Sequence, residues 1–233
     1  MYHPFSITQT LNIAWHIFKK NVAIISVYFI IGLIIIGLSV FLINLVPFNT
    51  FFDLFAVLAI FIIVSFVFLG FIKLVFQLID KEYYDFEIKD ILPKPKMVVN
   101  YVLLLIIVST PVVFITKGIN NMVPGVLHNI LGFITDWIFQ IFFIFYLPIC
   151  NCFIVDDNSG FFESIKQTNQ LIKGNLIKYT LLLILLEGMI FVFFLTIIGI
   201  IFIIPFVNII LAVTYRKLIY SHLDVDDDVT ETV

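Results

Sequence analysis

The chain has 233 residues, of which 62% are hydrophobic and only 12% are charged. A soluble domain has about 45–50% apolar and about 25% charged residues, so this chain carries too little charge to cover a water-soluble globule. Its net charge of −3 also excludes the basic footprint that a nucleic-acid binder needs. The composition therefore predicts a polytopic membrane protein.

Five apolar runs follow one another along the chain, and a membrane-crossing helix needs about 20 such residues. The last run, residues 179–213, has 35 residues and is too long for one span. Gly199 lies near its middle and can supply a tight turn, so we split the run there into a hairpin. The prediction is an all-α fold, a single integral membrane domain over residues 1–233. Its six transmembrane helices are expected at about residues 22–46, 51–78, 98–115, 127–153, 177–197 and 200–220.

The basic residues indicate how these spans are oriented. Twelve of the thirteen Lys and Arg residues fall on one side of the six spans, and only Lys117 falls on the other. By the positive-inside rule the basic side is cytoplasmic, which places both termini in the cytoplasm. One Arg against twelve Lys, with abundant Ile, Phe and Asn, is typical of an AT-rich prokaryotic genome. We therefore expect a bacterial inner membrane.

Two segments resemble each other at an offset of 154 residues: residues 10–21 and residues 164–175. Each is amphipathic, ends in Lys-x-Asn and leads directly into a span, so each is predicted to be a helix in the cytoplasmic interface. Residues 80–96 form a third interfacial element, in which aromatic and charged residues alternate. The interfacial anchors predicted from these segments are Trp15, Lys19, Lys20 and Lys173.

Four polar side chains fall inside the predicted spans: Glu187, Asn208, Asp136 and His128. Ionisable groups at membrane depth are functional candidates by default, and these four would serve ion coupling or a polar substrate pocket. The alternative is that they are satisfied polar groups that hold the bundle together. With the turn near residue 198, Glu187 and Asn208 come level, so we expect Glu187 to face the bundle interior. Its expected partner is Asn208, with Asp136 from the fourth span as the alternative.

Other patterns that could indicate chemistry are incomplete. Cys150 and Cys152 have no His or acidic cluster to complete a zinc site. The acidic tail at residues 224–228 lacks the Gly and the distal Glu of a calcium loop. Neither a nucleophile elbow nor a Gly-rich phosphate loop occurs. The sequence thus predicts no bound metal, no cofactor and no enzymatic activity.

Several loose motifs carry a family resemblance. They lie at residues 5–6, 15–21, 70–74, 85–91, 155–157, 164–166, 171–175, 199, 205 and 215–218. With these motifs the chain resembles a group of uncharacterised bacterial inner-membrane proteins, the glycerophosphoryl diester phosphodiesterase membrane-domain family with its YciC-like relatives. Some members are fused to a soluble phosphodiesterase domain, for which this chain has no room, so the resemblance implies no reaction for the membrane part.

The leading functional hypothesis is a non-enzymatic inner-membrane protein that binds membrane lipid or assists another membrane protein complex. Aromatic residues interleaved with Lys favour the anionic inner leaflet, by about 1 kcal/mol per basic residue. The alternative is a small transporter or channel that uses the intramembrane carboxylates. A lipid-modifying enzyme is a distant third, because Asp156 and Asp157 are the only adjacent acidic pair near the inner headgroups outside the tail.

Overall fold

The computed structural model describes residues 5–45, 50–80, 87–123, 125–194 and 197–230, and within these ranges it contains helices and turns but no β-strand. The elements are α1 (Ile7–Asn44), α2 (Thr50–Asp80), α3 (Ile88–Ile91), α4 (Pro95–Asn120), α5 (Val126–Ile141), the π-turn η1 (Phe142–Tyr146), α6 (Leu147–Asp156), α7 (Phe161–Lys173), α8 (Leu176–Phe194) and α9 (Ile197–Thr230).

Six of the described helical stretches are long and apolar enough to cross a membrane, which confirms the predicted all-α membrane fold. Several begin earlier or end later than predicted. The first starts at Ile7 because the predicted interfacial segment is continuous with the first span, and the third runs on to Asn120. The six stretches are Ile7–Asn44, Phe55–Asp80, Ile88–Asn120, Val126–Asp156, Leu176–Phe193 and Ile201–Ser221.

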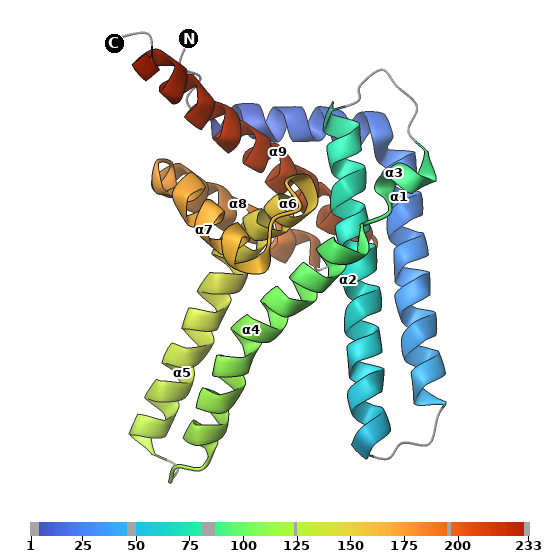
Figure 1. Cartoon of the computed structure of the whole chain (residues 1–233), viewed down its shortest axis with the longest axis vertical. Coiled ribbons are helices and arrows are strands. Elements are labelled where there is room, and N and C mark those ends of the chain that lie inside the picture. Colours follow the sequence, from blue (N-terminus) through green and yellow to red (C-terminus); the bar gives the residue numbers. More distant parts are fainter. Residues whose placement is uncertain (1–4, 46–49, 81–86, 124, 195–196, 231–233) are drawn as a thin grey trace.

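Both copies of the internal repeat form a helix that turns into a span at an Asn. In α1 the bend is at Asn21, whose φ of −118° and ψ of 18° are not helical. Figure 1 shows the first part of α1 running across the upper part of the molecule, while the rest descends beside α2. In the second copy α7 ends at Lys173, and α8 begins with the Asn175 carbonyl accepting a bond from the Tyr179 N–H at 2.9 Å. The predicted helices and corners are confirmed.

The repeat extends to the side chains that are buried. Positions 154 residues apart are buried in both copies, so the two segments dock on the core through equivalent faces. The small residues at the first two of these positions allow close approach to neighbouring helices. The matched buried pairs are Thr10 with Ser164, Ala14 with Thr168, Phe18 with Ile172, and Ile25 with Tyr179.

Helix α9 is the centre of the bundle and packs against α1, α2, α6, α7 and α8. In its most apolar stretch 67% of the residues are buried, against 11% in α1. Two aromatic contacts illustrate this packing: the Phe206 ring lies 5.2 Å from Phe18, and the Tyr215 ring lies 4.9 Å from Phe153. The core is therefore built around the last helix of the chain.

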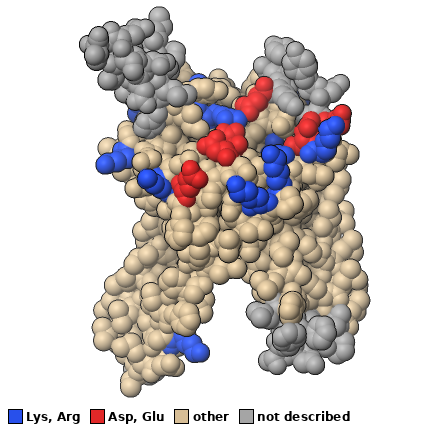
Figure 2. Space-filling model, in the orientation of Figure 1, with Lys and Arg blue, Asp and Glu red and all other residues tan. Residues whose placement is uncertain are grey.

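The hairpins α1–α2 and α4–α5 diverge from this core like two legs (Figure 1). Charged side chains gather where the legs join, and the legs themselves are almost free of charge (Figure 2). We call the joined end the charged end and the opposite tips of the legs the far end. Lys117 lies in the last turn of α4, toward the far end. The uneven distribution of basic residues that the sequence predicts thus has a spatial counterpart.

The connections between the spans differ from the prediction at Gly199 and lie partly outside the described residues. Gly199 does not form the turn of the last hairpin, because α9 already begins at Ile197 and Gly199 lies within its first turn. The hairpin connection falls at residues 195–196, outside the described residues, as do residues 46–49 and the aromatic residues at 83, 84 and 86. Of the third interfacial element the structure describes the short helix α3, whose start has a capping box formed by Glu87 and Asp90.

Candidate functional site

An ion-pair cluster joins three helices at the charged end. Arg216 of α9 donates to Asp156 at the end of α6, from Nη1 to Oδ2 at 2.7 Å and from Nη2 to Oδ1 at 3.0 Å. Nη2 also donates to Oδ2 of Asp80, the last residue of α2, at 2.5 Å. Tyr215 Oη donates to Asp156 Oδ2 at 3.1 Å, and the guanidinium carbon lies 4.7 Å from the centroid of the Phe76 ring.

This cluster is partly withdrawn from solvent. The Arg216 and Asp156 side chains are 19% and 21% exposed, and Asp80 is 43% exposed. A two-point Arg–carboxylate pair is stronger and more directional than a single contact, and here it fixes the ends of α2, α6 and α9 relative to one another. Asp156 is thus engaged in a structural pair. The neighbouring Asp157 carboxyl is exposed, and desolvation together with the Asp156 charge raises its pKa above the ordinary value.

The sequence did not single out this cluster, because Arg216 was counted only as one more basic residue after the last span. A signal was nevertheless present. It is the only Arg among thirteen basic residues, and Arg is preferred over Lys where a carboxylate must be bound at two points.

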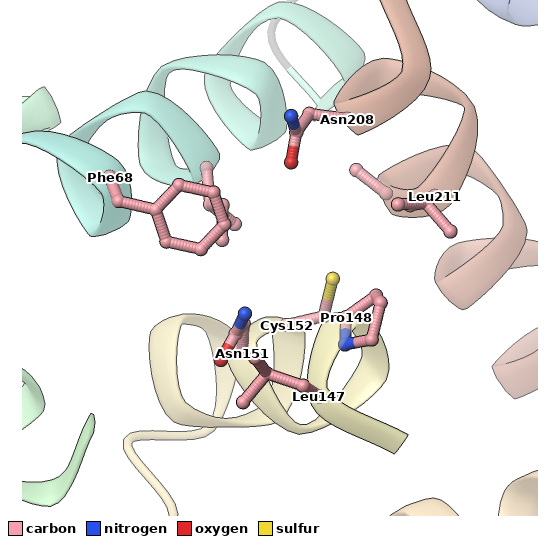
Figure 3. A pocket seen from close by; sticks show the side chains of 9 residues that line it. Phe68, Leu147, Pro148, Asn151, Cys152, Asn208 and Leu211 are labelled. Carbon is pink, nitrogen blue, oxygen red and sulfur yellow. The ribbon is translucent and has the colours of Figure 1, made fainter. Parts of the chain in front are cut away.

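A small polar cavity lies next to the cluster, one helical turn earlier along α6 and α9. Its volume is about 100 Å³. Figure 3 shows Asn208 of α9 on one side of the cavity and Asn151, Cys152 and Pro148 of α6 on the other. The remaining lining is apolar and comes from Phe68, Ile72, Leu147, Leu211 and Ala212.

The helix that carries half of this lining is irregular. The π-turn η1 precedes α6, and Pro148 follows at the start of α6, where its missing N–H removes a helical donor. Tyr179 Oη of α8 donates to the Phe145 carbonyl at 3.0 Å, which supplies a donor to the disturbed turn. Such π-turns are frequent at functional sites.

A second hollow, the apolar groove, lies between α1, α2 and α3. Its volume is about 850 Å³, and among the described residues that line it only Tyr28 carries a polar side-chain atom. The Tyr28 hydroxyl is engaged, because it donates to the Val67 carbonyl at 3.0 Å. The lining residues are Ala23, Ile24, Val27, Tyr28, Ile31, Gly32 and Ile35 of α1, Ile62, Ile63, Phe66, Val67 and Leu74 of α2, and Ile88, Ile91 and Leu92 from α3 and its C-cap.

Two glycines bring α1 and α2 together at the floor of the groove. A Cβ on Gly32 would lie 2.7 Å from Val67 Cγ1, and a Cβ on Gly70 would overlap Tyr28 Oη. By contrast, a Cβ on Gly37, further along α1, would meet nothing within 4 Å. The close approach is therefore confined to the part of α1 that borders the groove.

At its charged end the groove is closed by α3 and the chain that follows it. Lys73 Nζ of α2 donates to the Leu92 carbonyl at 2.8 Å, and Lys89 pairs with Glu87 at 2.6 Å with both side chains largely exposed. Lys94 is exposed as well. Lys73, Lys89 and Lys94 thus lie near the closed end of an otherwise apolar groove, together with the carboxylates of Glu87 and Asp90.

The predicted contact between Glu187 and Asn208 is wrong. Helix α8 packs through Tyr179, Leu182, Leu183 and Leu186, a stripe at helical spacing, and Glu187 lies beside this stripe on an exposed face. Asn208 Nδ2 donates to the Ile204 carbonyl at 2.9 Å. The Leu-rich sequence of α8 does not indicate which of its faces is buried, so the depth of Glu187 alone could not place its side chain.

The other two intramembrane candidates also lie apart. Asp136 is exposed on α5, and His128 is half-buried near the start of the same helix. His128 Nδ1 lies 3.3 Å from Asn129 Oδ1, and no hydrogen bond joins His128 to Asp136. Within the described residues the structure brings none of the four predicted polar side chains together.

The predicted interfacial anchors lie where the charged end begins. Trp15 is 52% exposed and places its ring edge-on to Phe206, with centroids 5.6 Å apart. Lys19, Lys20 and Lys173 are exposed at the ends of the two repeated helices. Trp15 thus has one side on the core and one side exposed, and its location in the membrane interface stays a prediction.

The described residues hold no group of three His, Cys, Asp or Glu side chains that is arranged to bind a metal ion. Cys150 and Cys152 are both buried and free, and Cys150 Sγ lies 3.3 Å from Thr168 Oγ1. Cys150 therefore contributes to the contact between α6 and α7, while Cys152 faces the polar cavity.

Comparison of the chain with protein-family models, with curated proteins and with solved structures finds no match. The resemblance to the phosphodiesterase membrane-domain family therefore stays a prediction. The functional argument rests on the two hollows and the ion-pair cluster of this chain.

Proposed function

We propose that the protein is a non-enzymatic membrane protein that binds a phospholipid, with an acyl chain in the apolar groove between α1, α2 and α3. The groove itself carries this proposal. It is large, it is lined almost entirely by hydrocarbon, and many of its side chains are exposed, among them Ile24, Val27 and Ile62. An acyl chain matches that lining, since it has no polar group that would be left unpaired.

The direction of the groove supports a lipid held by its tail. Along α1 the lining runs from Ala23, just after the Asn21 corner, to Ile35. From the first to the last of these 13 residues the helix rises about 18 Å at 1.5 Å per residue, from the charged end into the span. A chain in this groove would descend from the headgroup level in the direction of the bilayer lipids.

The charges at the closed end support an anionic headgroup. Lys73 adjoins the groove residue Leu74, and Lys89 and Lys94 belong to the segment that closes the groove. Each basic residue near an anionic leaflet contributes about 1 kcal/mol to the free energy of binding to that surface. The uneven distribution of Lys along the chain points to the same side. The proposal therefore includes that the protein lies in the bacterial inner membrane with both termini in the cytoplasm.

The other hypotheses gain less support. An accessory subunit of another membrane complex would act through the same bound lipid or through the exposed faces of the α1–α2 and α4–α5 hairpins. These faces are apolar and do not indicate which kind of partner would bind. A transporter or channel would use carboxylates that share a path, whereas Glu187 and Asp136 are exposed on different helices and line none of the hollows described above.

The proposal is tested by filling the groove. Val27 lines it and Leu38 does not, although both are on α1 and both are 56% exposed. We expect Val27→Trp to retain several-fold less phospholipid than the unchanged protein after purification in a mild detergent, measured by native mass spectrometry. Leu38→Trp is the matched control and should retain the normal amount. Equal lipid content in the two variants would overturn the proposal.

A further inference from the structure

The polar cavity between α2, α6 and α9 contains a buried amide with no partner. Asn151 is 1% exposed, and its Oδ1 has no hydrogen bond with any described group. Its Nδ2 forms no hydrogen bond within the described residues either. Leaving a buried polar group unpaired costs about 1–3 kcal/mol, so this side chain requires a hydrogen-bonding partner from outside the protein.

The cavity provides a second polar group across from the first. Asn208 uses its Nδ2 to bind the Ile204 carbonyl, and its carbonyl oxygen forms no bond within the described residues. In Figure 3 the Asn208 oxygen and the Asn151 nitrogen point toward the space between α9 and α6, while the Asn151 oxygen points away from it. A ligand in this space must be able to donate to one amide and to accept from the other.

Size and charge restrict the ligand further. The cavity measures about 100 Å³, whereas a single water molecule needs about 10–15 Å³ of such space and occupies about 30 Å³ in the liquid. Its lining has no carboxylate, ammonium or guanidinium group to balance an ion. An apolar ligand would leave the Asn151 amide and the Asn208 oxygen unpaired. Empty cavities in proteins are apolar, whereas polar ones hold ordered water.

We propose that this cavity is an internal water site, in which a small cluster of water molecules links Asn151 of α6 to Asn208 of α9. The ion-pair cluster lies one turn beyond the cavity on both helices, where Asp156 follows Cys152 and Arg216 follows Ala212. The contact between α6 and α9 is then partly water-mediated inside the span, while the Arg216–Asp156 ion pair joins the same two helices directly.

The two buried cysteines provide an internal comparison for the test. Cys152 lines the cavity, whereas Cys150 is 0% exposed, contacts Thr168 and does not line it. Brief X-ray irradiation converts bound water to hydroxyl radicals that modify adjacent sulfur atoms. The protein in lipid nanodiscs is irradiated, and tandem mass spectrometry then measures the oxidation rate at each cysteine. We expect Cys152 to be oxidised several-fold faster than Cys150.

Two variants complete the test. Asn151→Leu removes the amide and fills part of the cavity, so the Cys152 rate should fall to that of Cys150. Asn44→Leu replaces an exposed Asn at the far end and should leave the Cys152 rate unchanged. Equal rates at Cys150 and Cys152 in the unchanged protein would overturn the proposal, and this comparison does not depend on either variant folding. A Cys152 rate that Asn151→Leu leaves high would overturn it as well.

Discussion

Helices α5 and α6 are consecutive parts of one apolar span, joined by the π-turn η1, and they are packed in opposite ways. No residue of α5 is buried, whereas eight of the ten residues of α6 are. In α6 the side chains face α7, α9 and α2, and they include Asn151 and two cysteines. In α5 large apolar side chains such as Phe133 and Ile138 are exposed.

The difference shows what hydropathy measures in a membrane protein. Lipid tails are as apolar as a leucine side chain, so apolar character does not distinguish the interior from the lipid-facing surface. What marks the interior here is small and polar side chains with partners on other helices. Thr168 against Cys150 and Arg216 against Asp156 are the examples that α6 provides. The following four predictions test this division, from the largest expected effect to the smallest.

The largest effect is expected from Arg216→Met. Removing one member of a buried ion pair costs about 3–5 kcal/mol, and because a fifth of each side chain is exposed we expect about 3 kcal/mol of lost unfolding free energy, measured in mixed micelles. Lys217→Met, at the next position, is the control and should change it by less than about 0.5 kcal/mol. Similar losses in the two variants would show that the cluster does not join α2, α6 and α9.

The second prediction compares α6 with α5 directly. Ile154 is 0% exposed and Ile138 is 64% exposed. Because the surrounding lipid is apolar, the main cost of Ile154→Ala is the cavity that it leaves, at about 24 cal/mol per Å³. We expect the unfolding free energy to fall by about 2 kcal/mol. Ile138→Ala should leave the unfolding free energy nearly unchanged. A comparable loss at Ile138 would mean that α5 is packed against a partner.

The third prediction concerns the close contact beside the groove. Gly32→Ala adds a Cβ against Val67, and overpacking costs about 1–3 kcal/mol. Because Ala gains up to about 1 kcal/mol over Gly in a helix, the net loss should be about 1 kcal/mol in the same unfolding assay. Gly37→Ala has open space and should be neutral or stabilising. If both variants behave alike, α1 and α2 are not in close contact there.

The smallest effect is expected at Asp157. Desolvation and the Asp156 charge raise its pKa in the folded protein above the ordinary value of 3.8. Between the ordinary pKa and the raised one, the folded protein therefore binds more protons than the unfolded chain. The Asp157 carboxyl thus lowers the stability of the fold as the pH rises through that range. Asp157→Asn should raise the melting temperature slightly at neutral pH, and the difference should vanish below pH 3.8. A lower melting temperature at neutral pH would show that the Asp157 charge stabilises the fold.

The sequence predicts the features of this protein that follow from composition and local pattern. The six spans follow from apolar length, and the corners at Asn21 and Asn175 follow from a repeat that both copies preserve. The contact of Glu187 could not be predicted, because every face of α8 is apolar and the buried stripe is chosen by tertiary packing. The apolar groove was also beyond prediction, since it depends on Gly32 and Gly70 facing specific side chains of the neighbouring helix.

Arg216 is an intermediate case. Its uniqueness in a Lys-rich chain is visible in the sequence, but its partners Asp80 and Asp156 lie 136 and 60 positions away. Only the folded arrangement of α2, α6 and α9 brings the three residues together. The composition could therefore have identified the residue, and the structure was needed to identify its role.

The most direct test of lipid binding in the groove is photocrosslinking with a phospholipid that carries a diazirine on its acyl chain. The groove faces of α1 and α2 and the exposed faces of α5 are comparably apolar, so lipid that only surrounds the protein would label both. If the groove is a binding site, crosslinks mapped by mass spectrometry will concentrate at groove residues such as Val27, Ile31 and Ile62. Equal labelling of these positions and of Phe133 and Ile138 on α5 would contradict the proposed function.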